Sequence, residues 1–254
     1  MADLTPEALF SARLAADPGA PLVTFYDDET GERAELSAKS LGNWVAKTHY
    51  LLLDELALAP GDRACVRLPV HWLAAPILLG CWFAGLEIVT APEQAGVVFA
   101  DADSLAVLDL AAAEDVFSVS LLSMARPSTP PAGASDYATS VRPMPDSWAT
   151  VRAQAGPEVP ALDGLSRARL AAAAAESAQR LGLAQGGRLL WTTDWSGESA
   201  GGAGDRAGAS AAENGWTAAL VAPLAVGGSV VLVRHPDESR TAAKAQAEHA
   251  TVVH

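Results

Sequence analysis

The residues best suited to chemistry form one short run of aromatic and polar side chains: Trp191, Thr192, Thr193, Asp194 and Trp195. The run overlaps the end of an apolar stretch, residues 188–192, that is typical of a buried strand. In parallel sheets, ligands bind beyond the carboxyl ends of the strands. Two indoles with hydroxyls and a carboxylate could therefore line an apolar pocket with a few polar anchors. The alternative is that the aromatic rings pack under the loop that follows.

A second candidate is His235, which follows the strand predicted over residues 229–233. If this strand runs parallel to the strand at 188–192, His235 and Asp194 lie at one edge of the sheet. They could then share a ligand pocket or act as an acid/base pair. A hydrolase using Asp194 and His235 is therefore the third hypothesis, after the two that rest on the resemblance described below.

We predict no catalytic residue, metal site or cofactor from the remaining motifs. The two cysteines, Cys65 and Cys81, are expected to be buried free thiols, and no Cys/His cluster has zinc-ligand spacing. The glycine-rich residues 196–215 lack lysine and carry three carboxylates, so we interpret them as a mobile loop, not a phosphate loop. His71, at the start of a predicted helix, is expected to be a cap or a surface residue.

Composition excludes several classes of partner. The chain has 254 residues, half of them hydrophobic, and a formal net charge of −13. This acidity disfavours nucleic acid and anionic membranes. The apolar residues 68–86 are long enough to cross a bilayer, but two prolines, two glycines and a following strand favour a core helix. With no signal-peptide pattern at the N-terminus, we expect a cytoplasmic location.

The elements that position these residues are organised around residues 61–92. Here a turn, a strand at 64–68, a helix at 72–84 and a strand at 86–90 predict a βαβ unit. The rest of the chain alternates strands and helices, which indicates an α/β fold with a largely parallel sheet flanked by helices. Further strands are predicted at residues 22–26, 33–36, 97–100, 105–110, 117–122 and 251–253, and further helices at 5–16, 37–56, 166–182, 216–225 and 238–248.

A proline-rich segment divides the sequence. Residues 125–165 have little periodicity, and we interpret them as a long surface connection with a little local structure around Tyr137 and Trp148. It separates an N-terminal half, 1–124, from a C-terminal half, 166–254.

Four stretches, in order, resemble the N-terminal part of the adenylate-forming superfamily of acyl-CoA synthetases, luciferases and adenylation domains. They are PLVTFYDDETGERAELSAKSLGNWVAKTHYLL, LALAPGDRACVRLPVHWLAAPILLGCWFAGLEIVTAP, SRARLAAAAAESAQRLGLAQGGRLLWTT and GWTAALVAPLAVGGSVVLVRHPD. The chain also resembles a group of short uncharacterised actinobacterial proteins. The resemblance implies a truncated version of the adenylate-forming fold.

The departures from that family bear on function. The resemblance implies a Ser/Thr/Gly-rich phosphate loop with a lysine just before Ser166, but that place reads RAQAGPEVPALDGLSRAR. The sequence also ends before the family's aromatic-Gly-x-Thr-Glu motif, ribose-binding aspartate and C-terminal lysine. We therefore expect a non-catalytic relative that binds a small acyl or aromatic ligand, or a protein partner. The alternative is a fragment of an ATP-dependent, AMP-forming acid–thiol ligase that another chain completes.

Overall fold

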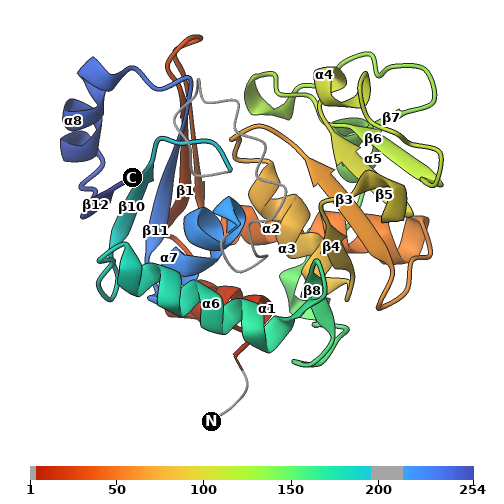
Figure 1. Ribbon diagram of the computed structural model, residues 1–254, viewed down its shortest axis with the longest axis horizontal. Coiled ribbons are helices and arrows are strands. Elements are labelled where there is room, and N and C mark those ends of the chain that lie inside the picture. Colours follow the sequence, from red (N-terminus) through yellow and green to blue (C-terminus); the bar gives the residue numbers. More distant parts are fainter. Residues whose placement is uncertain (1–3, 196–213) are drawn as a thin grey trace. The chain divides into compact units, whose positions relative to one another are not determined.

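The computed structural model describes residues 4–195 and 214–254, and they form two compact units, each with its own sheet (Figure 1). The first unit consists of Met1–Leu41, Pro69–Trp72 and Arg167–His254. The second consists of Gly42–Leu68 and Leu73–Ser166. These units differ from the predicted division into 1–124, 125–165 and 166–254, because an N-terminal strand pairs with a strand near the C-terminus.

The first unit holds a five-stranded sheet of order β12-β10-β11-β1-β2. Its strands are β1 (Pro21–Asp27), β2 (Glu32–Ser37), β10 (Arg188–Trp191), β11 (Ser229–Arg234) and β12 (Val252–Val253). All neighbours are parallel except the β1–β2 hairpin. The register pairs Val23 of β1 with Val230 of β11, which joins the start of the chain to its end.

The helices of the first unit lie on both sides of this sheet. They are α1 (Pro6–Ala16), α6 (Arg167–Arg180), the π-helical turn Thr217–Val221 with α7 (Ala222–Ala225), and α8 (Glu238–Ala247). Contacts join α1, α6 and α7 to one another and α7 to β11. Ala245 of α8 packs against Leu190, Val231 and Val233 of the sheet. Thr5 caps α1, and its hydroxyl accepts a hydrogen bond from the Ala8 N–H.

The second unit holds a seven-stranded sheet of order β7-β6-β5-β3-β4-β8-β9. Its strands are β3 (Arg63–Arg67), β4 (Glu87–Val89), β5 (Val97–Ala100), β6 (Asp115–Ser118), β7 (Ser135–Asp136), β8 (Pro160–Leu162) and β9 (Leu165–Ser166). Only the β8–β9 pair is antiparallel. Its helical segments are α3 (Ala74–Phe83), α4 (Ala102–Leu105), α5 (Tyr137–Val141) and three 3-10 turns, Pro92–Gln94, Ser123–Ala125 and Trp148–Thr150. Helix α2 (Ala38–Tyr50) starts in the first unit and continues into the second, followed by the π-helical turn Leu51–Glu55.

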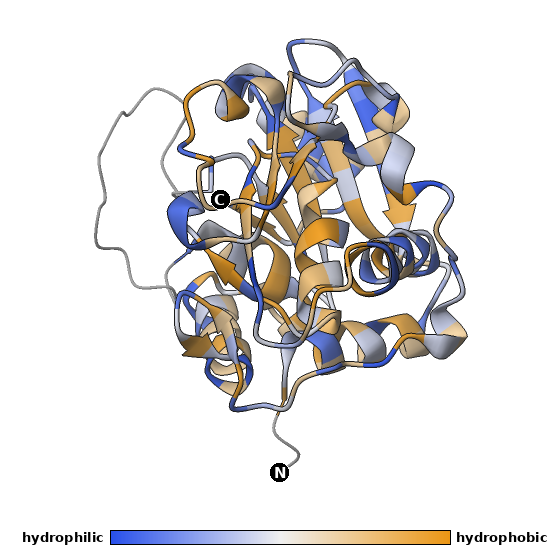
Figure 2. Ribbon diagram, turned by 90° about the vertical axis from the view of Figure 1, so that its right-hand side faces the viewer, coloured by the Kyte–Doolittle hydropathy of each residue, from blue (hydrophilic) through white to orange (hydrophobic). Residues whose placement is uncertain are grey.

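The predicted βαβ unit is confirmed as β3, α3 and β4. Every residue of α3 is buried, which is why its sequence is apolar on all sides. Gly85 follows the helix with φ +86, a conformation that glycine adopts without strain. The Trp82 indole donates a hydrogen bond to the Ala161 carbonyl oxygen at 3.0 Å, joining α3 to β8. Figure 2 shows hydrophobic residues concentrated in the strands and the buried helices.

The prediction of an α/β fold with mostly parallel strands and flanking helices is confirmed, with three local corrections. There are two sheets instead of one. The strand predicted over 105–110 is wrong: α4 and turns occupy this region, and Asp101 binds the Ser104 hydroxyl at the helix start. Residues 125–165 have the predicted local structure, in α5 at Tyr137 and the 3-10 turn at Trp148, but they also contribute β7 and β8 to the second sheet, which the sequence did not predict.

Two expectations concern segments outside these elements. Most of the loop predicted over 196–215, namely residues 196–213, lies outside the described residues. Across the residues that are described, helices are too short or too polar to cross a bilayer. The residues 68–86 that raised this question form the connection after β3, helix α3 and the turn after it.

Candidate functional site

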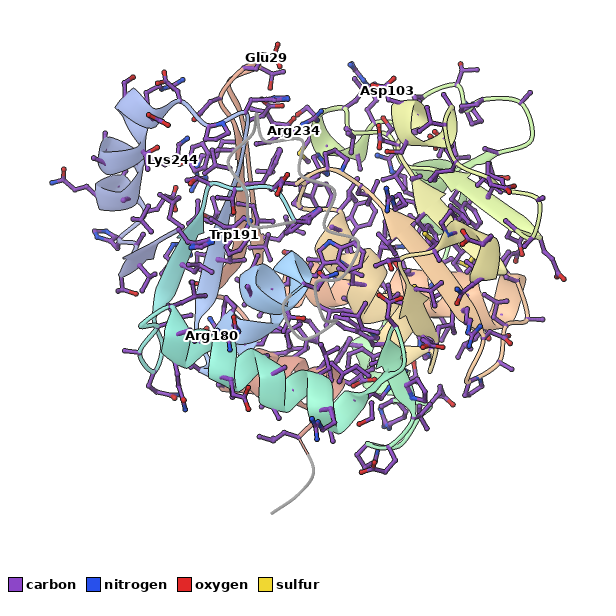
Figure 3. The ribbon with its side chains drawn as sticks, viewed as in Figure 1. Glu29, Asp103, Arg180, Trp191, Arg234 and Lys244 are labelled. Atoms are coloured by element: carbon purple, nitrogen blue, oxygen red, sulfur yellow. The ribbon has the colours of Figure 1, made fainter. Side chains whose placement is uncertain are left out.

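The carboxyl ends of β1, β10 and β11 lie at one edge of the first sheet. The parallel register pairs Trp191 with Leu232, and Asp27 with Arg234. The predicted parallel pairing of the two strands that precede Asp194 and His235 is thus confirmed. Figure 3 shows Glu29 and Arg234 at this end of the strands. We call this part of the first unit the carboxyl edge.

Trp191 and Thr192 tie the end of β10 to the end of the chain. The Trp191 side chain is 1% exposed, and its ring lies against the His254 imidazole with ring centroids 4.5 Å apart. Its indole nitrogen donates to the Asp194 carbonyl oxygen at 3.3 Å. The N–H and hydroxyl of Thr192 both donate to the His254 carbonyl oxygen, at 2.7 and 2.8 Å. Packing explains both residues, and a role for them in ligand binding stays a prediction.

Thr193 and Trp195 lie beside the start of the helix that leads into α7. The Gly215 N–H donates to the Trp195 carbonyl oxygen at 2.9 Å. Among the described residues, the Thr193 hydroxyl and the Trp216 indole nitrogen are buried and have no hydrogen-bond partner. Buried polar atoms are nearly always paired with protein, water or ligand. Both atoms lie in one junction, formed by residues 193–195 and 214–216.

His235 contacts two carboxylates that the sequence analysis did not single out. Its Nδ1 lies 3.0 Å from Asp27 Oδ1 and 3.2 Å from Glu29 Oε2. Asp27 ends β1, and Glu29 lies in the turn after it. The acidic residues 27–29, which follow a predicted strand, were the available signal in the sequence. Their contact with His235 could not be predicted from it, because that contact depends on the pairing of β1 with β11. A pair between Asp194 and His235 stays a prediction.

The Asp27 carboxylate is ionised in this setting. Burial raises its pKa, but hydrogen bonds from His235 and from the N–H groups of Glu29 and Thr30 have the larger combined effect. The pKa of Asp27 is therefore below its usual value. His235 has φ +48, in the left-handed region that is uncommon for residues other than glycine. The carboxyl edge thus carries a fixed negative charge beside an imidazole.

His71 was expected to be a cap or a surface residue, and the surface assignment is wrong. Helix α3 begins only at Ala74, so His71 lies in a buried segment with no exposed area. Its ring meets Phe25 edge to face at 4.6 Å. Burial, aided by the positive charge of Arg234 and opposed by Asp27, lowers the pKa of His71 to about 3. The imidazole is therefore neutral at physiological pH.

The β8–β9 hairpin of the second unit occupies the place where the resemblance implies a phosphate loop. The Asp163 carboxylate accepts hydrogen bonds from the N–H and hydroxyl of Thr90, at 2.9 and 3.0 Å. Glu87 accepts from the Gly164 N–H at 2.6 Å and forms an ion pair with Arg63 at 3.0 Å. Two carboxylates therefore lie at this hairpin, and that of Glu87 accepts the hydrogen bond of the Gly164 N–H in its turn.

Solved structures place the chain in a fold class. Over 98% of its length, the chain is similar in structure to an acyl-CoA synthetase from Brucella canis, of which it spans 47% (TM-score 0.74, 15% identity). It matches acetoacetyl-CoA synthetase from Streptomyces lividans over 98% of its length (TM-score 0.73, 21% identity, 42% of that chain). Over 95% of its length it matches the anthranilate CoA ligase AuaEII, solved in complex with anthranoyl-AMP (TM-score 0.67, 13% identity, 46% of that chain). The fold is that of the adenylate-forming enzymes, and this chain spans less than half of each.

The family is shown by sequence. The chain belongs to the TIGR03089 family, because it is 37% identical over 255 residues to the "TIGR03089 family protein" of Mycobacterium tuberculosis, covering 97% of this chain and 96% of the relative. No protein-family model matches the chain.

Proposed function

We propose that this chain is a non-catalytic relative of the acyl-activating, adenylate-forming enzymes, and that it binds a small acyl or aromatic acid. The observation that carries the proposal is the carboxylate-filled β8–β9 hairpin. A phosphate loop offers free backbone N–H groups and positive charge to the nucleotide. Here the Gly164 N–H is bound by Glu87, and the adjacent Asp163 carboxylate adds negative charge. A triphosphate at this place would meet repulsion instead of donors.

The ligand is proposed to bind at the junction of residues 193–195 with 214–216. Within the described residues, the Thr193 hydroxyl and the Trp216 indole N–H are two buried donors that have no acceptor. A carboxylate or carbonyl oxygen is the group that would satisfy them. The sequence-predicted residues of the edge, Trp191 to Trp195 and His235, remain the proposed lining, with Trp195 supplying an aromatic surface.

The nucleotide part of the proposal is tested by thermal unfolding and by ATP–pyrophosphate exchange. We expect millimolar MgATP to leave the melting midpoint unchanged, whereas a ligand at a hundredfold excess over Kd would add about 2.7 kcal/mol of stability. We also expect no exchange above background with a panel of carboxylic acids. A complete acyl-CoA synthetase run in parallel is the positive control. An upward shift or an exchange signal would overturn the non-catalytic proposal.

The ligand part is tested by tryptophan fluorescence. Aryl and fatty acids should quench or shift the emission as they contact an indole at the junction. Thr193→Val removes one buried donor with little change in volume and should weaken binding about tenfold, because hydrogen bonds to charged groups contribute roughly 1.5–3 kcal/mol. Trp148→Phe, in the second unit, is the matched control and should leave the affinity unchanged. If no acid alters the emission, the protein-partner version of the hypothesis replaces the small-ligand version.

The alternative is a fragment of an AMP-forming acid–thiol ligase that a second chain completes. It is favoured by one observation, the match to only 42–47% of three solved enzymes. Exchange activity that appears only when a second protein is added would establish it.

A further inference from the structure

We propose that Asp27, Glu29 and His235 bind a divalent transition-metal ion such as Zn²⁺ at the carboxyl edge. One imidazole nitrogen and one oxygen from each carboxylate lie within 4.8 Å of one another. This mixed nitrogen and oxygen donor set suits Zn²⁺, Mn²⁺ or Co²⁺. The proposal does not depend on the acyl-ligand proposal.

The distances fit coordination by a shared ion. Two ligand atoms that are each about 2.1 Å from an ion, at angles of roughly 90° to 110°, are about 3.0–3.4 Å apart. His235 Nδ1 lies 3.0 Å from Asp27 Oδ1 and 3.2 Å from Glu29 Oε2. The Glu29 side chain is 71% exposed, so its rotation can bring the carboxylates closer to each other.

Two of the three ligands are held in place by the backbone. Asp27 and Arg234 are partners in the parallel ladder, and His235 directly follows Arg234. The Asp27 carboxylate is further fixed by the Glu29 and Thr30 N–H groups at 3.0 and 3.4 Å. Its side chain is 6% exposed, whereas that of His235 is 41% exposed. The site is therefore preorganised on one side and open to water on the other, leaving room for further ligands.

The charge balance also favours a cation. A neutral imidazole carries one hydrogen, so Nδ1 can donate to one carboxylate well but not to two. The neighbouring Asp28 carboxylate is neutralised by Lys244, at 2.6 and 2.7 Å. Within the part of the chain that the structure describes, His235 is the one basic side chain within ion-pair distance of Asp27 and Glu29. A divalent ion would balance both carboxylates.

Calorimetric titration of the chelator-treated chain with Zn²⁺ tests the proposal. We expect one equivalent to bind at physiological ionic strength, where weak attraction to the −13 surface is screened. His235→Ala and Glu29→Gln should each weaken binding at least tenfold. Glu29 is exposed, so its variant should remain folded. Titration with Co²⁺ should give visible absorption bands in the wild type that His235→Ala loses.

The matched control is His249→Ala. His249 is exposed and, like His235, has a left-handed backbone, with φ +52. This variant should bind Zn²⁺ within twofold of the wild type. Absence of binding to the wild type, or equal binding to the wild type and to His235→Ala, would show that Asp27, Glu29 and His235 form an ordinary ion-pair cluster and would overturn the proposal.

Discussion

In the second unit, the Cys65 and Cys81 thiols and the Tyr137 hydroxyl are buried, and burial raises the pKa of each, that of Cys65 to about 11. In the first unit, Asp27 and Glu248 are buried too, and burial likewise raises their pKa values. Hydrogen bonds and nearby positive charges there have the larger combined effect, however, and the pKa of both carboxyls is lowered. Burial alone thus does not decide the charge of a group; its partners do.

The partners of these buried groups differ between the two units. On the α8 side of the first sheet, Glu248 accepts hydrogen bonds from Tyr26, Arg33 and Arg188. In the second unit, Tyr137 instead meets the neutral Thr48 hydroxyl at 2.7 Å. The buried Glu248 carboxylate of the first unit therefore has charged partners, whereas the buried Tyr137 hydroxyl of the second unit has a neutral one.

The largest expected effect is on the buried ion pair between α1 and α6. Glu7 and Arg167 lie 2.7 Å apart, with side chains 2% and 0% exposed. Arg167→Met leaves the Glu7 carboxylate buried without this partner and should lower the free energy of unfolding by about 3–5 kcal/mol. Thr48→Val, which breaks the neutral Tyr137 pair, should cost about 1–2 kcal/mol. Urea unfolding measures both, and equal losses would contradict the contrast.

A pH dependence should come next in size. The folded-state pKa of His71 is about 3, below the unfolded value of about 6.5. The unfolded chain therefore takes up a proton first, so the stability due to neutral His71 is complete above pH 6.5 and declines as the pH falls toward 3. The slope should approach roughly 1 kcal/mol per pH unit within this window.

The variant His71→Gln separates the contribution of His71 to this pH dependence from the contributions of other groups. Burial also lowers the pKa of His49 in the second unit, so the wild type includes both contributions. The variant should lose part of the slope between pH 6.5 and 4.5 in urea or thermal unfolding. A variant with the wild-type slope would show that His71 is not the neutral buried group described here.

A smaller loss is expected from crowding α3 against α2. A Cβ atom on Gly80 would lie 2.6 Å from Cβ and Cγ2 of Thr48. Gly80→Ala should therefore destabilise the second unit by about 1–3 kcal/mol, since well-packed interiors resist added volume. Gly19→Ala is the control, because its nearest contact would be 3.8 Å from Asp17 Oδ1. If Gly80→Ala is neutral, packing in the second unit is looser than described.

The smallest expected signal is thiol reactivity. Cys65 and Cys81 have no exposed area, and their pKa values are raised. Because the thiolate is the reactive form, both should resist a disulfide reagent at pH 8 and react fully in urea. Rapid labelling of either thiol in the native chain would show that this part of the second unit opens easily.

The sequence by itself determined most of the secondary structure. The apolar run of α3, the VVLV core of β11 and the Ser166-to-Gly182 helix pattern predicted elements that the structure contains, because local periodicity records which faces of an element are buried. The alternation of strands and helices also predicted a largely parallel sheet, which includes the strands ending near Asp194 and His235. The adenylate-forming fold was implied by the resemblance of four stretches of the sequence to that superfamily.

The tertiary structure alone decided which elements are neighbours. A strand's sequence shows that it is buried but not which strand lies beside it, since that depends on contacts between distant segments. The β1–β11 pairing brings Asp27 and Glu29 to His235 and joins the two ends of the chain in one unit. The same kind of long-range contact buries His71 and places Glu87 against the Gly164 turn. The candidate sites therefore depend on contacts between distant segments and not on local sequence patterns.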